Sequence, residues 1–261
     1  MNIDLTGKTA IVTGASGGIG QAICKKYIAA GANVAAVDMR EQEGESFVEE
    51  LKSQGGSAAF IKGDVSSKDS MDQMCTSAIE TFGRIDILVN NAGRNVGHEG
   101  RKKIHEFSED DWKSIIDIDL SGVFFCSRPV IRHMIENGGG KILNIGSVVG
   151  LVPFRNQCAF AAAKAGVIHL TKVMAIELAE YNVLVNCVCP GSTMVPSLKQ
   201  LWFSDKDAAE QQLSHIPLHR VADPEEMAGA VIFATSDEAS YMTGNIITID
   251  GGWTSGYARD F

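Results

Sequence analysis

The sequence lacks an excess of positive charge, long apolar runs and any metal-binding pattern. Its 23 lysines and arginines against 32 aspartates and glutamates give a net charge of −9, which disfavours nucleic acids and anionic membranes as partners. No segment reaches the ~18 uninterrupted apolar residues of a membrane span. The N-terminus has no basic region followed by an apolar core, so we expect a cytoplasmic protein with small-molecule partners. Six cysteines without CxxC spacing and six histidines without an HExxH group predict neither a disulfide framework nor a metal site.

The chain also has no internal repeat and no low-complexity linker, and 261 residues is within the range of one α/β domain. Short apolar runs alternate with helical patterns over most of its length, which predicts a doubly wound parallel sheet covered by helices on both faces. The expected strands are Thr9–Val12, Val34–Val37, Ala58–Lys62, Ile85–Val89, Lys141–Ile145 and Val183–Cys189. The expected helices are Gln21–Ala30, Glu41–Gln54, Ser70–Thr81, Ser108–Asn137 and Cys158–Tyr181.

Four glycines lie in the stretch Thr13–Gly20, between the first strand and the first helix, and three of them have the spacing of a dinucleotide turn. Gly14 permits a tight turn, Gly18 lets the backbone approach a pyrophosphate, and Gly20 lets the helix pack on the strand. The N-terminal amides of the helix would face the phosphates. The pattern predicts a Rossmann-type dinucleotide site, to which we also assign Ser16, Gly17 and Ile19.

Asp38 ends the second expected strand, roughly 20 residues past the glycines, where a carboxylate accepts hydrogen bonds from ribose hydroxyls. Its charge would repel the 2′-phosphate of NADP, and no lysine or arginine lies inside the glycine turn to offset it. We therefore expect NAD as the cofactor. Arg40 lies close by and leaves NADP as the alternative.

The motif Thr-Gly-x-x-x-Gly-x-Gly, then Asp64-Val65, then Asn90-Asn-Ala-Gly93, in this order and spacing, resembles the short-chain dehydrogenase/reductase family. The resemblance extends to Ile249-Asp-Gly-Gly252 and covers nearly the whole chain. It implies that Asp64 and Val65 frame the adenine and that Asn91, Ala92 and Gly93 line the cofactor. It also implies that Pro190, Gly191 and Thr193 belong to the loop over the nicotinamide amide.

In this family a serine polarises the substrate oxygen, a tyrosine transfers the proton, a lysine four residues later lowers the pKa of that tyrosine, and an asparagine positions a relay water. Ser147 and Lys164 match the pattern, and Lys164 would also hold the nicotinamide ribose. Phe160 stands at the tyrosine position and Asp119 at the asparagine position. The loss of a general acid–base typically costs on the order of 10²–10⁴ in rate.

Three explanations of Phe160 remain open. The chain is an ordinary dehydrogenase altered from tyrosine to phenylalanine, or an enzyme whose proton path uses Asp119, Ser147, Lys164 or ordered water. The third explanation is a catalytically silent relative that binds NAD. A non-redox enzyme that uses NAD for transient hydride transfer is a further alternative. We favour an NAD-dependent oxidoreductase, in which Ser147 stabilises an alkoxide. For Asp119, a purely structural pairing with Lys164 is the equal alternative.

The substrate is less well defined by the sequence. A lid at about residues 192–218 carries apolar residues that either wall a pocket or pack ordinarily: Met194, Leu198, Leu201, Trp202 and Phe203. Arg155 and the basic loop Arg94–Phe107 suggest a small anionic or polyhydroxy substrate, although a solvated loop is the plainer interpretation. The family resemblance also implies a homo-oligomer, commonly a tetramer, packed through the two longest helices.

Overall fold

The computed structural model describes residues 3–196, 198–199 and 206–256. Seven parallel strands form one sheet in the order β3-β2-β1-β4-β5-β6-β7, so the expected doubly wound α/β fold is confirmed. The strands are β1 (Thr9–Thr13), β2 (Asn33–Asp38), β3 (Ala58–Lys62), β4 (Ile87–Asn90), β5 (Gly140–Ile145), β6 (Val183–Pro190) and β7 (Ile246–Ile249). Strand order reverses between β1 and β4, and ligands bind at such a switch point in open α/β sheets.

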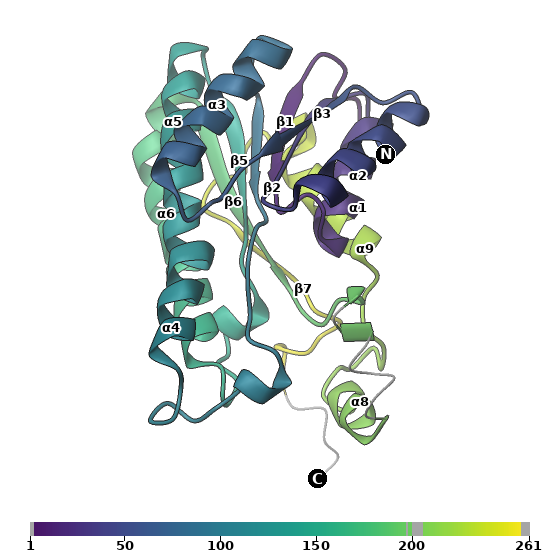
Figure 1. The fold of residues 1–261 in the computed structure, drawn as a ribbon, viewed down its shortest axis with the longest axis vertical. Coiled ribbons are helices and arrows are strands. Elements are labelled where there is room, and N and C mark those ends of the chain that lie inside the picture. Colours follow the sequence, from purple (N-terminus) through teal and green to yellow (C-terminus); the bar gives the residue numbers. More distant parts are fainter. Residues whose placement is uncertain (1–2, 197, 200–205, 257–261) are drawn as a thin grey trace.

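Helices cover both faces of the sheet, with α1, α2 and α9 on one side and α3, α5 and α6 on the other (Figure 1). The described helices are α1 (Gly18–Ala29), α2 (Glu41–Ser53), α3 (Lys68–Phe82), α4 (Glu109–Ile116), α5 (Gly122–Glu136), α6 (Cys158–Leu178), α8 (Lys206–Leu213) and α9 (Pro224–Ala234). Short 3₁₀ turns occupy His98–Gly100, Val148–Gly150, Ala179–Tyr181 and Asp237–Ala239.

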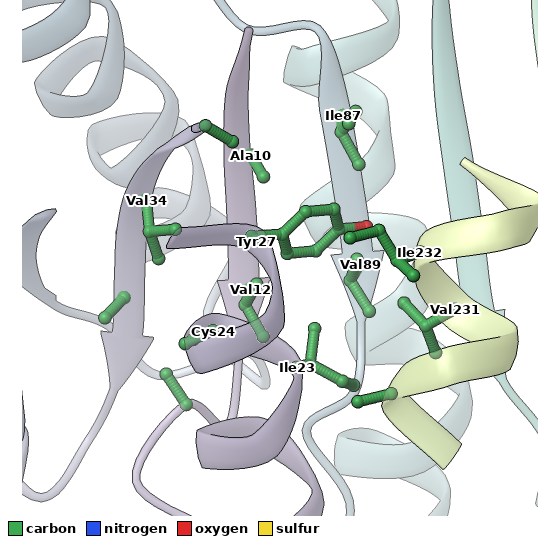
Figure 2. Packing of buried hydrophobic residues seen from close by; sticks show 14 of the residues in the cluster. Ala10, Val12, Ile23, Cys24, Tyr27, Val34, Ile87, Val89, Val231 and Ile232 are labelled. Atoms are coloured by element: carbon green, nitrogen blue, oxygen red, sulfur yellow. The ribbon is translucent and has the colours of Figure 1, made fainter. Parts of the chain in front are cut away.

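The core has two halves because successive strand residues point to opposite faces. Ala10 and Val12 of β1 pack into the half beneath α1 and α9, whereas Ile11 between them packs into the half beneath α3 and α5. Figure 2 shows the first half, where Tyr27 and Ile23 of α1 lie between the sheet and α9. All five β1 residues are buried, which explains why the strand is apolar rather than alternating.

The expected helix Ser108–Asn137 is interrupted in the structure. Ser108 caps its start by accepting a hydrogen bond from the Asp111 amide at 3.2 Å, as predicted. The segment Asp117–Ser121 then widens into a π-helix between α4 and α5. Such widened turns frequently occur at functional sites, and this one contains Asp119, whose side chain is fully buried.

The helical segment Cys158–Tyr181 is long and apolar enough to span a membrane by length and composition alone. It packs against β6 and the Val148–Gly150 turn, and nine residues of α6 are buried, Lys164 among them. These are the properties of a core helix on the face of a sheet.

Candidate active site

The glycine turn is tied to the end of β4 by hydrogen bonds. The Thr13 hydroxyl accepts from the amides of Asn91 and Ala92, at 3.0 and 3.1 Å. In return, the Asn91 side-chain amide donates to the carbonyl oxygens of Thr13 and Gly14, at 2.9 and 3.2 Å. The first and fourth strands thus hold the predicted cofactor motifs in one unit at the switch point.

Glycine is required at two positions of this turn. Gly14 has a φ of +64°, and a Cβ there would lie 2.8 Å from the Cα of Ala92. A Cβ on Gly20 would lie 2.2 Å from the carbonyl oxygen of Gly14. Side chains here would separate the turn from the helix that begins at Gly18.

A cleft of about 680 Å³ follows the turn, in the usual size range of cofactor sites. Twelve predicted cofactor residues line it, namely Gly14, Ser16, Gly17, Gly18, Ile19, Gly20, Asp38, Asp64, Val65, Asn91, Ala92 and Gly93. The buried Ser16 hydroxyl has no hydrogen-bond partner within the described chain. An orphaned hydroxyl beside helix N-terminal amides fits the phosphate or ribose of a dinucleotide.

Asp38 reaches the cleft from the end of β2. Its carboxylate accepts hydrogen bonds from the Ser16 amide at 3.0 Å and from the Arg40 amide and guanidinium at 3.0 and 3.3 Å. Burial opposes ionisation, but these hydrogen bonds and the Arg40 charge outweigh it and hold the pKa of Asp38 below its ordinary value. Asp38 is therefore a carboxylate at neutral pH, with Arg40 beside it in the same cleft.

Lys164 and Asp119 form a buried ion pair behind the cleft. The Lys164 Nζ lies 3.1 Å from Asp119 Oδ2 and donates a hydrogen bond to the Ile145 carbonyl oxygen at 3.1 Å. Asp119 Oδ1 accepts from the Arg94 amide at 2.7 Å. A Cβ on Gly93 would lie 3.0 Å from Asp119 Oδ2 and 3.4 Å from Lys164 Nζ, so a side chain at this position would crowd the pair.

Ser147 and Phe160 line a second cavity, of about 500 Å³, which shares Val195 with the cofactor cleft. The Ser147 hydroxyl follows β5 and accepts a hydrogen bond from the Val149 amide at 3.2 Å. The Phe160 ring centroid lies 5.6 Å from Lys164 Nζ, within the range of a cation–π contact. The structure thus brings the four predicted catalytic residues together.

The residues predicted to cover the nicotinamide lie in different environments. Pro190 and Gly191 line the second cavity rather than the cleft. Thr193 lines neither and is buried, and its hydroxyl donates to the Gly191 carbonyl oxygen at 3.3 Å. In the predicted lid, Leu198 lines the second cavity, whereas Leu201, Trp202 and Phe203 lie outside the described residues.

Arg155, which the sequence suggested as a substrate-binding residue, is exposed and does not line the second cavity. Arg94 is already paired, donating to Asp111 at 2.9 Å and to Ser114. Within the loop Arg94–Phe107, the cationic residue that lines the second cavity in the described structure is Arg101. A loop's side-chain directions depend on its tertiary path, which the sequence pattern does not encode.

Sequence reasoning also missed a buried polar chain that holds α6 against the sheet. The Asn90 amide donates to Asn144 Oδ1 at 2.8 Å and to the Ser127 hydroxyl at 2.9 Å, and the Asn144 amide donates to the Thr171 hydroxyl at 2.9 Å. Asn144 interrupts the apolar run of β5, which is the signal that could have revealed it. These bonds fix the helix that carries Phe160 and Lys164.

This chain belongs to the short-chain dehydrogenase/reductase family of oxidoreductases. It matches the family described as enoyl-(acyl carrier protein) reductase over residues 14–254. It is 40% identical over 256 residues to an uncharacterised oxidoreductase of Thermotoga maritima, covering 97% of this chain and 100% of that protein. It is also 39% identical to the 3-oxoacyl-(acyl-carrier-protein) reductase FabG of Thermotoga maritima, covering 95% of this chain and 98% of FabG. A related crystal structure is assigned as an NAD(P)-dependent gluconate 5-dehydrogenase from Beutenbergia cavernae, with NADP at low occupancy. It is 34% identical to this chain and superposes on it with a TM-score of 0.90. The match covers 98% of this chain and 100% of that chain.

Proposed function

We propose that this protein is an NAD-dependent oxidoreductase that interconverts a small polar alcohol and its ketone by a proton path without a tyrosine. The observation that carries the proposal is that the predicted cofactor cleft and the cavity of the predicted catalytic residues adjoin each other. A glycine-lined cleft with the unpartnered Ser16 hydroxyl adjoins a cavity that carries Ser147. When bound, the nicotinamide supplies or accepts a hydride. The residues of the chain then have two tasks, to hold the substrate oxygen and to move one proton.

Ser147 holds the substrate oxygen through its hydroxyl and stabilises the negative charge that develops there. Phe160 stands at the position of the family's tyrosine, so the ring remains but the proton-carrying hydroxyl is gone. Lys164 supplies positive charge from behind Gly93 and binds the cofactor ribose. Asp119, paired with Lys164 at 3.1 Å, accepts the proton of the alcohol through water during oxidation and returns it during reduction.

We propose NAD rather than NADP because the ionised Asp38 carboxylate lies where a 2′-phosphate would be placed. The hydrogen bonds that lower its pKa keep that negative charge in place at neutral pH. NADP remains the alternative, supported by Arg40 in the same cleft and by the NADP in the related structure.

The absence of the phenol favours a second candidate, a silent relative that binds NAD without turnover. We would measure NAD binding by calorimetry and NADH formation over a panel of polyols and hydroxy acids. We expect turnover by the chain as written, and a fall in kcat of about 10²- to 10⁴-fold in Asp119→Asn with NAD affinity retained. NAD binding without turnover of any panel member would identify the silent binder. A gain of that size in Phe160→Tyr would instead identify a weakened ordinary dehydrogenase.

We also propose a homo-oligomer, with a tetramer as the family resemblance implies, packed through α5 and α6. Phe124 of α5 is 51% exposed and Ile176 of α6 is 80% exposed, unusually open positions for large apolar side chains. Light scattering after size exclusion tests this, and a monomer at micromolar concentration would contradict it.

A further inference from the structure

The second cavity carries positive charge in a strongly acidic protein. The chain has a net charge of −9, yet no aspartate or glutamate occurs in the described lining of this cavity. Arg101 is an exposed residue that lines it, and among the described residues it has no carboxylate ion-pair partner. A guanidinium in a lining without acidic side chains makes the cavity favourable for an anion.

The neighbouring cations do not share this position. Arg94 forms an ion pair with Asp111 at 2.9 Å, and Lys102, Lys103 and Arg155 are exposed outside the cavity lining. A single guanidinium matches one carboxylate, which it can bind through two parallel hydrogen bonds. His215 also lines the cavity, on the lid side.

The remainder of the lining offers hydroxyl-binding groups and one aromatic wall. Asn95 donates to Gln157 Oε1 at 2.9 Å, which fixes two side-chain amides in the cavity lining. Phe154 packs on Trp253 with ring centroids 4.9 Å apart. Side-chain amides bind hydroxyl groups, and an aromatic face covers the C–H surface of a polyol.

We propose that Arg101 is the specificity-determining residue for a small polyhydroxy carboxylate, bound with its reacting hydroxyl at Ser147 and its carboxylate at Arg101. This inference rests on the proposed oxidoreductase function and adds to it the substrate class and the residue that selects it. The reaction is the two-electron oxidation of the secondary alcohol to a ketone, with the hydride passing to NAD and the proton passing through water to Asp119.

The test compares gluconate with sorbitol, a neutral polyol of the same carbon number, as substrates of the intact protein with saturating NAD. Arg101→Gln should raise the KM for gluconate by about 10- to 100-fold, the range of a charge-assisted hydrogen bond, and leave sorbitol unchanged. Arg101→Lys should restore part of the loss. Arg155→Gln, which removes an exposed cation outside the cavity lining, is the matched control and should change neither the KM for gluconate nor the KM for sorbitol.

A binding measurement separates this inference from the proposed function. Trp253 lines the cavity, so its fluorescence should report gluconate binding to the NADH complex without turnover, and Trp253→Phe should abolish the signal. If NAD does not bind, the proposed function fails. If NAD binds but gluconate does not, or if Arg101→Gln affects gluconate and sorbitol equally, the carboxylate assignment alone is overturned. Preference for a sugar phosphate over gluconate, lost in Arg101→Gln, would also overturn it.

Discussion

Replacement of Asp119 by alanine removes one partner of the most deeply buried ion pair among the described residues. The Asp119 side chain is 0% exposed and that of Lys164 is 6% exposed. The alanine would leave the Lys164 ammonium buried with only the Ile145 carbonyl as a partner. It would also leave the Arg94 amide without its acceptor. Loss of one partner from a buried pair costs about 3–5 kcal/mol.

For a domain of this size each kcal/mol lowers Tm by roughly 2–4 °C, so Asp119→Ala should lower Tm by roughly 6–20 °C. Asp119→Asn should lower it less, because the amide oxygen still accepts from Arg94 and only the charge is lost. Circular dichroism during a thermal ramp measures both shifts.

The control is the Arg220–Glu226 pair, whose two hydrogen bonds are both 2.7 Å but whose side chains are 53% and 41% exposed. Solvent screens such a pair, so Arg220→Ala should change Tm little despite its better geometry. If Asp119→Ala lowers Tm no more than Arg220→Ala does, burial does not increase the contribution of the Asp119–Lys164 pair to stability, and the reasoning is refuted.

Three further predictions concern the turn, the cofactor and pH. Gly20→Ala should destabilise the folded protein by about 1–3 kcal/mol or more and weaken NAD binding, because the new Cβ would lie 2.2 Å from the Gly14 carbonyl oxygen. In the matched variant Gly229→Ala, the new Cβ would have no heavy atom of the described residues within 4 Å, so it should stabilise the folded protein by up to about 1 kcal/mol. Similar unfolding curves for the two variants would contradict this. Asp38→Ser should lower the Kd for NADP relative to the Kd for NAD. An unchanged ratio of the two Kd values would show that Asp38 does not select the cofactor. Hydrogen bonds from Arg220 and from the Asp223 amide lower the pKa of Glu226 to about 2. Because solvent screens this exposed pair, its stabilisation relative to Glu226→Gln should be small, complete above pH 4.5 and lost as the pH falls through about 2, which urea unfolding across that range checks.

Local sequence patterns predicted the elements of this fold well. Apolar runs bounded by glycines gave six of the seven strands because a parallel strand buried on both faces is apolar throughout. The glycine turn lies between β1 and α1 as expected, because a tight turn and helix packing on the strand each require glycine at a fixed offset. The π-helical segment around Asp119 was not foreseen, since no residue in Asp117–Ser121 marks the widening in the way a proline or glycine would.

The sequence by itself therefore determined the fold class and the position of the glycine turn, because both depend on residue type and spacing at short range. The tertiary structure showed that Asp119 pairs with Lys164, which the sequence left as one of two alternatives, and that Arg101 rather than Arg155 lines the second cavity. Both contacts join segments distant in the chain, and side-chain directions across such distances are set by how the helices and loops pack on the sheet.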